Sequence, residues 1–139
     1  MSTTAITALA FDYGLRTIGV AVGQSITNTA QPLTSLRAKD GIPIWDEIQQ
    51  LLSQWKPDVV VVGLPLNMDG SHSEMCTRAN KFARRIHGRF GVKIELADER
   101  LSSFEAKGDI IKTTGSRNFK AENVDSLAAK LILETWFNA

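Results

Sequence analysis

The sequence predicts an α/β fold in which a mixed sheet has helices on both faces, and three observations carry this prediction. Three short apolar segments come first, joined by polar turns that are too short to hold a helix. Two helical patterns then alternate with two further apolar segments, and helical patterns close the chain. A short turn joins antiparallel strands, whereas a helical connection is typical of parallel strands. Such an order implies a sheet that contains both strand directions.

The N-terminal part is expected to form an antiparallel meander. Its strands are predicted at residues 5–11, 17–22 and 30–36. The turn Tyr13–Arg16 between the first two strands is too short for a parallel crossover. Gly19 and Gly23 lie in or just after the second strand, where a glycine marks a bulge or a close approach of backbones.

The first helix is predicted at residues 43–55, with Pro43 in its first turn and an end forced by Pro57. Its apolar residues fall on one face: Ile44, Ile48, Leu51, Leu52 and Trp55. The next segment, Val59–Leu64, is apolar throughout, which is typical of a strand buried on both faces of a parallel sheet.

The second half continues the alternation of helix and strand. A helix is expected at residues 74–90, with Gly91 placed to cap its end, and a strand follows from Val92. A short helix is expected after Ser102, and the last helix at residues 124–137. The residues expected partly inward on that last helix are Val124, Leu127, Leu131 and Trp136.

Length and composition predict one soluble domain over residues 1–139, with 43% hydrophobic and 22% charged residues. The net charge of +1 identifies no partner by itself. Cys76 is the only cysteine, so no intramolecular disulfide can form. The N-terminus lacks a signal-peptide pattern, and the longest apolar stretch is too short to span a bilayer. We therefore expect a cytoplasmic protein without a membrane partner.

Acidic residues stand at the ends of several predicted elements. Asp12 follows the first strand, Asp98 and Glu99 follow the last strand, and Asp125 lies in the first turn of the last helix. Ends of parallel strands meet at one edge of a sheet, where α/β proteins place their sites. If the first and last strands run parallel and close together, Asp12 and Glu99 converge there. A helix packed on the sheet could bring Asp125 to the same place.

Carboxylates in one cleft repel each other unless a cation neutralises them. Oxygen ligands without His or Cys favour Mg²⁺ or Mn²⁺ over zinc, and such a cluster suits phosphodiester hydrolysis with two metal ions. Structural readings stay open at each position: Asp12 as a turn residue beside Gly14, Asp125 as a helix-dipole partner, and Asp98 or Glu99 paired with Arg100.

Segments that run in order along almost the whole chain match the motifs of one known family. They are Phe11–Ala21, Val62–Gly70, Asp98–Ser103 and Val124–Ala129. The second and third segments are specific, whereas the strand-Asp-x-Gly opening also occurs in related folds. On these segments the chain resembles the YqgF (RuvX) family, a branch of the RNase H-like superfamily related to the RuvC resolvases.

The resemblance implies an RNase H-like fold with a five-stranded mixed sheet, its first three strands antiparallel and helices on both faces. It also implies that Asp12, Glu99 and Asp125 are catalytic residues that bind two Mg²⁺ or Mn²⁺ ions. Asp98 is the less certain neighbour, because adjacent strand residues point to opposite faces.

Family members are described as candidate nucleases that process the 5′ end of precursor 16S rRNA in ribosome biogenesis, and earlier as candidate Holliday junction resolvases. The expected partner is therefore nucleic acid, as structured RNA, branched DNA or a ribosomal precursor particle.

Basic side chains are candidates for phosphate contacts, which position a nucleic acid without reading its sequence. Arg78, Lys81, Arg85 and Arg89 form one stripe on the second predicted helix, although a solvated face is the alternative. For Gly14, a tight hairpin turn is the favoured alternative to a phosphate contact. The full set of substrate-binding candidates is Gly14, Asn67, Arg78, Lys81, Arg85, Arg100, Arg117 and Lys120.

The leading hypothesis is a metal-dependent endonuclease that acts on precursor rRNA. A resolvase of four-way DNA junctions is the close variant and needs a symmetric homodimer rather than a monomer, because both strands must be cut. A noncatalytic RNA- or ribosome-binding factor is the second class. A nucleotide-binding lobe of the actin and sugar-kinase kind ranks last, since those proteins clamp nucleotide between two lobes.

Overall fold

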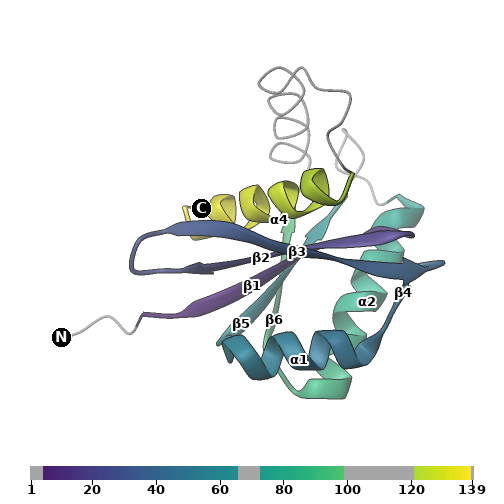
Figure 1. Cartoon of the computed structure of the whole chain (residues 1–139), viewed down its shortest axis with the longest axis horizontal. Coiled ribbons are helices and arrows are strands. Elements are labelled where there is room, and N and C mark those ends of the chain that lie inside the picture. Colours follow the sequence, from purple (N-terminus) through teal and green to yellow (C-terminus); the bar gives the residue numbers. More distant parts are fainter. Residues whose placement is uncertain (1–4, 66–72, 99–120, 139) are drawn as a thin grey trace.

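A computed structural model describes residues 5–65, 73–98 and 121–138, with side chains in the last range from Ser126 onward. Within these ranges the chain forms one sheet between helices (Figure 1). The strands are β1 (Thr7–Asp12), β2 (Thr17–Gln24), β3 (Thr29–Lys39), β4 (Ile42–Pro43), β5 (Val59–Leu64) and β6 (Ile94–Asp98). The helices are α1 (Trp45–Trp55), α2 (Glu74–Phe90) and α4 (Ala121–Phe137). No helix in these ranges is long and apolar enough to cross a membrane.

The central strand of the sheet is β1, in the order β4-β3-β2-β1-β5-β6. Strands β1, β2 and β3 are antiparallel neighbours, whereas β5 runs parallel to β1 and β6 runs parallel to β5. The predicted mixed sheet with three antiparallel strands at its start is therefore confirmed. The three parallel strands all end at one edge of the sheet, and Asp12 is the last residue of β1 there.

The described sheet has six strands rather than the five that the resemblance implies, because of β4. After β3 the chain turns through Asp40 and Gly41, whose φ angles are +50° and +80°, and β4 pairs back on the end of β3. Pro43 thus ends a short edge strand, a place that tolerates the missing N–H of proline. The prediction that Pro43 opens the first helix was wrong, since α1 begins at Trp45.

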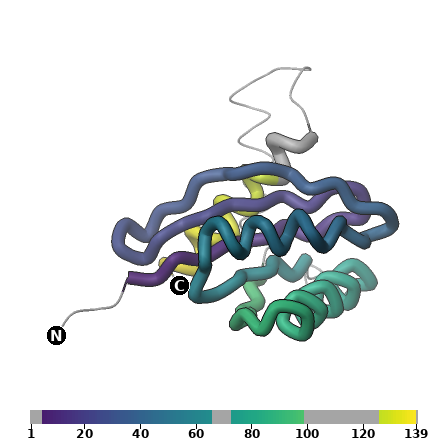
Figure 2. The backbone as a smooth tube through the Cα atoms, turned by 60° about the horizontal axis from the view of Figure 1, so that its bottom comes forward, coloured from purple at the N-terminus to yellow at the C-terminus, as the bar shows by residue number. Residues whose placement is uncertain are grey.

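Two cores lie on the two faces of the sheet. Helices α1 and α2 cover one face and α4 covers the other (Figures 1 and 2). Alternation along β1 supplies both cores: Leu9 and Phe11 pack on the α1/α2 face, and Ala8 and Ala10 pack on the α4 face. Strand β5 is also buried on both faces, which explains its unbroken apolar run Val59–Val62.

The α4 face of the sheet is built from small residues, so the helix lies close to the strands. On β1, β2 and β3 its floor is Ala8, Ala10, Ala21 and Ala30, and β5 adds Val59 and Val61. A Cβ atom on Gly23 would lie 2.7 Å from the Thr29 carbonyl oxygen and 2.8 Å from the Phe137 ring. Glu134 Oε2 accepts a hydrogen bond of 3.1 Å from the backbone N–H of Ala30. These contacts hold α4 against β2 and β3.

Helix α2 has both of its ends capped. The Ser73 hydroxyl accepts a hydrogen bond from the Cys76 N–H at 3.0 Å and donates one of 2.9 Å to the Pro65 carbonyl, just beyond β5. At the other end Gly91 has φ of +70° and donates its N–H to the His87 carbonyl at 2.8 Å. The predicted bounds and glycine cap of this helix are confirmed.

Replacing Gly23 with alanine should destabilise the protein, because the new Cβ would meet backbone and ring atoms that close packing holds in place. We expect a loss of about 1–3 kcal/mol in the free energy of unfolding, measured by urea denaturation. Gly88→Ala is the matched control, since Gly88 lies inside α2 with nothing within 4 Å of an added Cβ. That variant should gain about 0.5–1 kcal/mol. Equal effects at both glycines would contradict the packing described for α4.

Candidate active site

Asp12 is a buried carboxylate at the end of the central strand. Its exposed fraction is 7%, and the only other buried polar or charged residue in the described part of the chain is Ser126, on α4. A buried carboxylate is costly unless hydrogen bonds, an opposite charge or a metal ion compensates it. The position of Asp12 at a strand end, as expected from the sequence, is confirmed.

The strand register places the Asp12 side chain on the α4 face. Ala8 and Ala10 pack on that face, and alternation assigns Asp12 to it as well. Asp12 pairs with Gly19 of β2. On the other side, Phe11 pairs with Val62, so Gly63 of β5 is level with Asp12. The residues level with Asp12 on both adjacent strands are therefore glycines, which carry no side chain.

The same register separates Asp98 from Asp12. Ala97 of β6 pairs with Gly63 and packs in the α4 core. Asp98 pairs with Leu64, which packs in the α1/α2 core. Asp12 and Asp98 thus lie at the same edge of the sheet but on opposite faces, and one strand, β5, separates β1 from β6. Asp98 is therefore set apart from any site that forms around Asp12.

Tyr13, the residue after Asp12, turns to the α1/α2 face. Its ring centroid lies 4.9 Å from that of Phe82, and its hydroxyl donates a hydrogen bond of 2.9 Å to the Gly41 carbonyl. Burial raises the pKa of the Tyr13 hydroxyl, although Arg78 and Arg85 lower it in part. The phenol therefore keeps its proton for this hydrogen bond at neutral pH.

Gly14 lies in the turn between β1 and β2, as expected if it is needed for a tight hairpin turn. A Cβ atom there would lie 2.5 Å from the Thr17 carbonyl oxygen, so the turn has no room for a side chain. The glycine is explained by the hairpin, and a phosphate contact at Gly14 stays a prediction.

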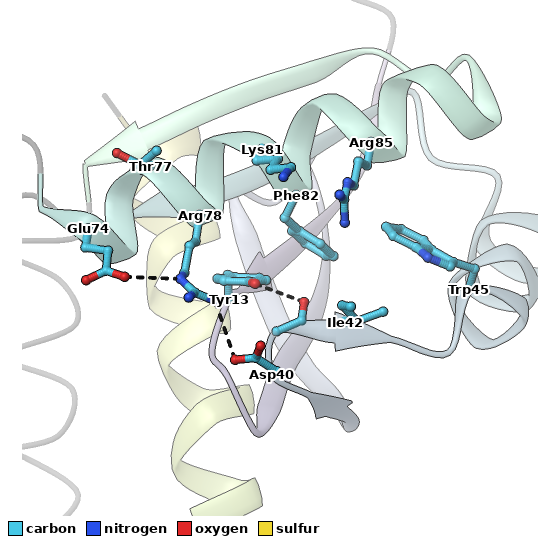
Figure 3. A pocket seen from close by; sticks show the side chains of 11 residues that line it. Tyr13, Asp40, Ile42, Trp45, Glu74, Thr77, Arg78, Lys81, Phe82 and Arg85 are labelled. Carbon is cyan, nitrogen blue, oxygen red and sulfur yellow. Dashed lines mark hydrogen bonds and ion pairs between the residues drawn. The ribbon is translucent and has the colours of Figure 1, made fainter.

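Three of the four residues of the predicted basic stripe on α2 lie together, although their phosphate contacts stay a prediction. Arg78, Lys81 and Arg85 line one pocket of about 500 Å³ on the α1/α2 face (Figure 3). Arg89 does not line the pocket, and its guanidinium carbon lies 4.3 Å from the ring centroid of Trp45. Trp45, Ile42 and Tyr13 also line this pocket, and sequence reasoning did not assign them to a site. They come from separate segments, so no local pattern in the sequence could group them.

Several predicted site residues lie outside the described residues: Asn67, Glu99, Arg100, Arg117 and Lys120. Asp125 belongs to α4, one turn before Ala129 of the core, and its side chain also lies outside the description. Among described side chains, no group of three His, Cys, Asp or Glu residues could hold a metal ion. Because the side chains of Glu99 and Asp125 lie outside the described part of the chain, this result does not test the predicted metal site.

Comparison with known proteins gives a consistent result. A model of the RuvX family, described as Holliday junction resolvase, matches residues 6–139. A relative from Mannheimia succiniciproducens is 57% identical over 132 residues, which cover 95% of this chain and 94% of the relative. One from Marinobacter nauticus is 58% identical over 128 residues, covering 92% and 90%. Both carry the name "Putative pre-16S rRNA nuclease".

Solved structures share the fold at low sequence identity. Thermus thermophilus RuvC in complex with a Holliday junction substrate aligns with a TM-score of 0.57 at 14% identity, covering 95% of this chain and 93% of that chain. The yeast mitochondrial Holliday junction resolvase aligns with a TM-score of 0.56 at 10% identity, covering 94% and 77%. These likenesses confirm the RNase H-like fold that the sequence resemblance implied. Because the family match and the two relatives span almost its whole length, this chain belongs to the RuvX family.

Proposed function

We propose that this protein is a metal-dependent endonuclease that hydrolyses phosphodiester bonds at the α4-side edge of its sheet. The observation that carries the proposal is a buried carboxylate, Asp12, at the end of the central strand with glycines level with it on both neighbouring strands. The strand holds the carboxylate at the sheet edge, and the level glycines place no side chain of their own beside it. The names of the relatives and the description of the family support nuclease chemistry.

We assign the metal ligands to Asp12, Glu99 and Asp125, with Mg²⁺ or Mn²⁺ as the ions. Carboxylate oxygens alone form the hard donor set that these ions prefer. Ala97 faces α4, and the two-residue period of a strand therefore supports Glu99, rather than Asp98, as the partner of Asp12. For Asp125, the support is its place one turn before Ala129 on the helix that covers this face.

When bound, two such ions lower the pKa of an attacking water and stabilise the leaving oxygen. The part played by the protein is to hold its carboxylates in place before substrate arrives. Asp12 is suited to this role because the central strand around it is buried on both faces. Its own burial also lowers the local dielectric and strengthens its attraction for a cation.

As substrate we propose the 5′ end of precursor 16S rRNA, by similarity to the named relatives, in the cytoplasm and on ribosomal precursor particles. The basic side chains Arg78, Lys81 and Arg85 provide phosphate contacts on the other face of the sheet. We further propose that Gly14, Asn67, Arg100, Arg117 and Lys120 contact the substrate.

A second candidate function is the resolution of four-way DNA junctions, which the family description and the RuvC likeness favour. Symmetric cleavage of a junction requires two active sites in a homodimer, whereas cleavage of one RNA strand needs only a monomer. Comparing the cleavage of the two substrates, with the oligomeric state measured at the same protein concentration, separates the two functions.

The nuclease proposal is tested by Asp12→Asn, with Asp98→Asn as the matched control at the same edge on the opposite face. Asp12→Asn should lower Mg²⁺- or Mn²⁺-dependent cleavage of precursor 16S rRNA by about 100-fold or more, because it removes a charged metal ligand. Asp98→Asn should stay within about threefold of the wild type. Urea denaturation of both variants checks that they are folded. Equal losses in both variants, or no metal-stimulated cleavage by the wild type, would contradict the proposal.

The role of the glycines beside Asp12 is tested by Gly63→Val. Valine suits a buried strand, but its side chain would occupy the α4 face next to the Asp12 carboxylate. We expect affinity for Mn²⁺, measured by isothermal titration calorimetry, to fall by about tenfold or more. Unchanged Mn²⁺ affinity in a folded Gly63→Val protein would show that the space beside Asp12 is not used.

A further inference from the structure

A second candidate site lies on the face opposite Asp12. It is the pocket of about 500 Å³ between α2, the β3–β4 turn and the start of α1 (Figure 3). A volume of this order is typical of sites that hold small ligands. Its lining combines three cations with an apolar and aromatic wall and with two carboxylates near the rim. The cations are Arg78, Lys81 and Arg85, the wall is Tyr13, Ile42, Trp45 and Phe82, and the remaining lining residues are Asp40, Gly41, Glu74 and Thr77.

The apolar wall of the pocket is held rigid. Phe82 packs against Tyr13 at 4.9 Å and against Trp45 at 6.1 Å between ring centroids. The Tyr13 hydroxyl ties this wall to the β3–β4 turn through the Gly41 carbonyl. An added Cβ on Gly41 would overlap that hydroxyl, so the turn reaches this close only with glycine. A preformed wall loses little entropy when a flat ligand binds.

The cations of the pocket are available to an anion. Arg78 lies 3.6 Å from Asp40 and 3.7 Å from Glu74, but both acidic side chains are at least 80% exposed, so these ion pairs are weak. A phosphate can displace them, because a guanidinium binds it with two charge-assisted hydrogen bonds. Within the described residues, no carboxylate lies within 4.0 Å of a charged atom of Lys81 or Arg85. Cations also outnumber carboxylates in the lining.

The pocket is close to the proposed cleavage site along the backbone. Asp12 and Tyr13 are consecutive residues with Cα atoms about 3.8 Å apart, and their side chains leave the sheet on opposite faces. The end of β1 therefore contributes one residue to each of the two sites. An aromatic wall next to cations is the surface on which proteins bind unstacked nucleotides of single strands.

We propose that this pocket binds one unstacked nucleotide of the RNA strand that is cut at Asp12. Its base lies against Tyr13, Ile42 and Trp45, and its phosphate binds Lys81, Arg85 and Arg78. The inference rests on the proposed nuclease function for its substrate, but it concerns binding on the other face of the sheet. Its test therefore uses binding without divalent metal, where no cleavage is required.

The phosphate contacts are tested with a fluorescein-labelled ten-nucleotide oligouridylate, whose affinity is measured by fluorescence anisotropy at several salt concentrations. The Lys81→Ala/Arg85→Ala variant should bind about tenfold more weakly, and the salt dependence of its affinity should fall by about 1.4 in logarithmic slope. Arg84→Ala/Lys93→Ala is the matched control, since both residues line a separate hollow and the same charge is removed. That control should bind within about twofold of the wild type. Equal losses in the two variants would overturn the pocket as the binding place.

The base contact is tested separately by replacing exposed Ile42, whose exposed fraction is 52%, with serine. Wild type should bind oligouridylate about tenfold more tightly than an abasic strand of equal length, and Ile42→Ser should narrow that difference. No difference between the two strands in the wild type would overturn the base contact.

Competition by free 5′-UMP shows whether the pocket binds a nucleotide within a strand or a free mononucleotide. It should compete only weakly, because one nucleotide lacks the neighbouring phosphates, and binding of UMP more tightly than the oligonucleotide would overturn the assignment to a strand. Retained oligonucleotide affinity in Lys81→Ala/Arg85→Ala, together with lost cleavage in Asp12→Asn, would reject the pocket while leaving the nuclease function in place.

Discussion

Burial of β1 on both faces is the constraint on which the rest of this structure depends. The strand is at the centre of the sheet, with antiparallel β2 on one side and parallel β5 on the other. Because its side chains alternate, consecutive residues at its end serve two different faces. Asp12 goes to the α4 face and Tyr13 to the α1/α2 face. The end of one strand thereby places a candidate metal ligand on one face of the sheet and part of the pocket's apolar wall on the other.

Small residues on the strands around Asp12 shape the α4 face on which the proposed metal site lies. Alanines on β1, β2 and β3 let α4 lie against the sheet, and the Glu134–Ala30 hydrogen bond holds the helix there. Gly19 and Gly63 are the residues level with Asp12 on the adjacent strands, and neither carries a side chain. Small residues thus let α4 pack closely in the middle of this face, and they surround the proposed metal ligand Asp12 at its edge.

The sequence alone was sufficient for features that depend on local periodicity or on a single residue type. The apolar run of β5, the Gly91 cap of α2 and the antiparallel start of the sheet were all predicted in this way, whereas the Ser73 cap was not. Features that depend on register were not: Asp98 could be separated from Asp12 only once β6 was aligned with β5. The two-residue strand β4 is too short to leave a periodic signal. The inward face of α4 centres on Ala129, Ile132 and Leu133, which the prediction did not name, whereas Trp136, which it did name, packs against this core.

The central claim is that Asp12, on the α4 face, binds the catalytic metal. The most direct test is a crystal of the protein soaked in Mn²⁺, with data collected at the manganese absorption edge to locate the ion by its anomalous scattering. The account predicts an anomalous peak about 2.1 Å from a carboxylate oxygen of Asp12, with carboxylates of Glu99 and Asp125 also bound. A peak at Asp98 on the opposite face, or bound Mn²⁺ that does not contact Asp12, would contradict it.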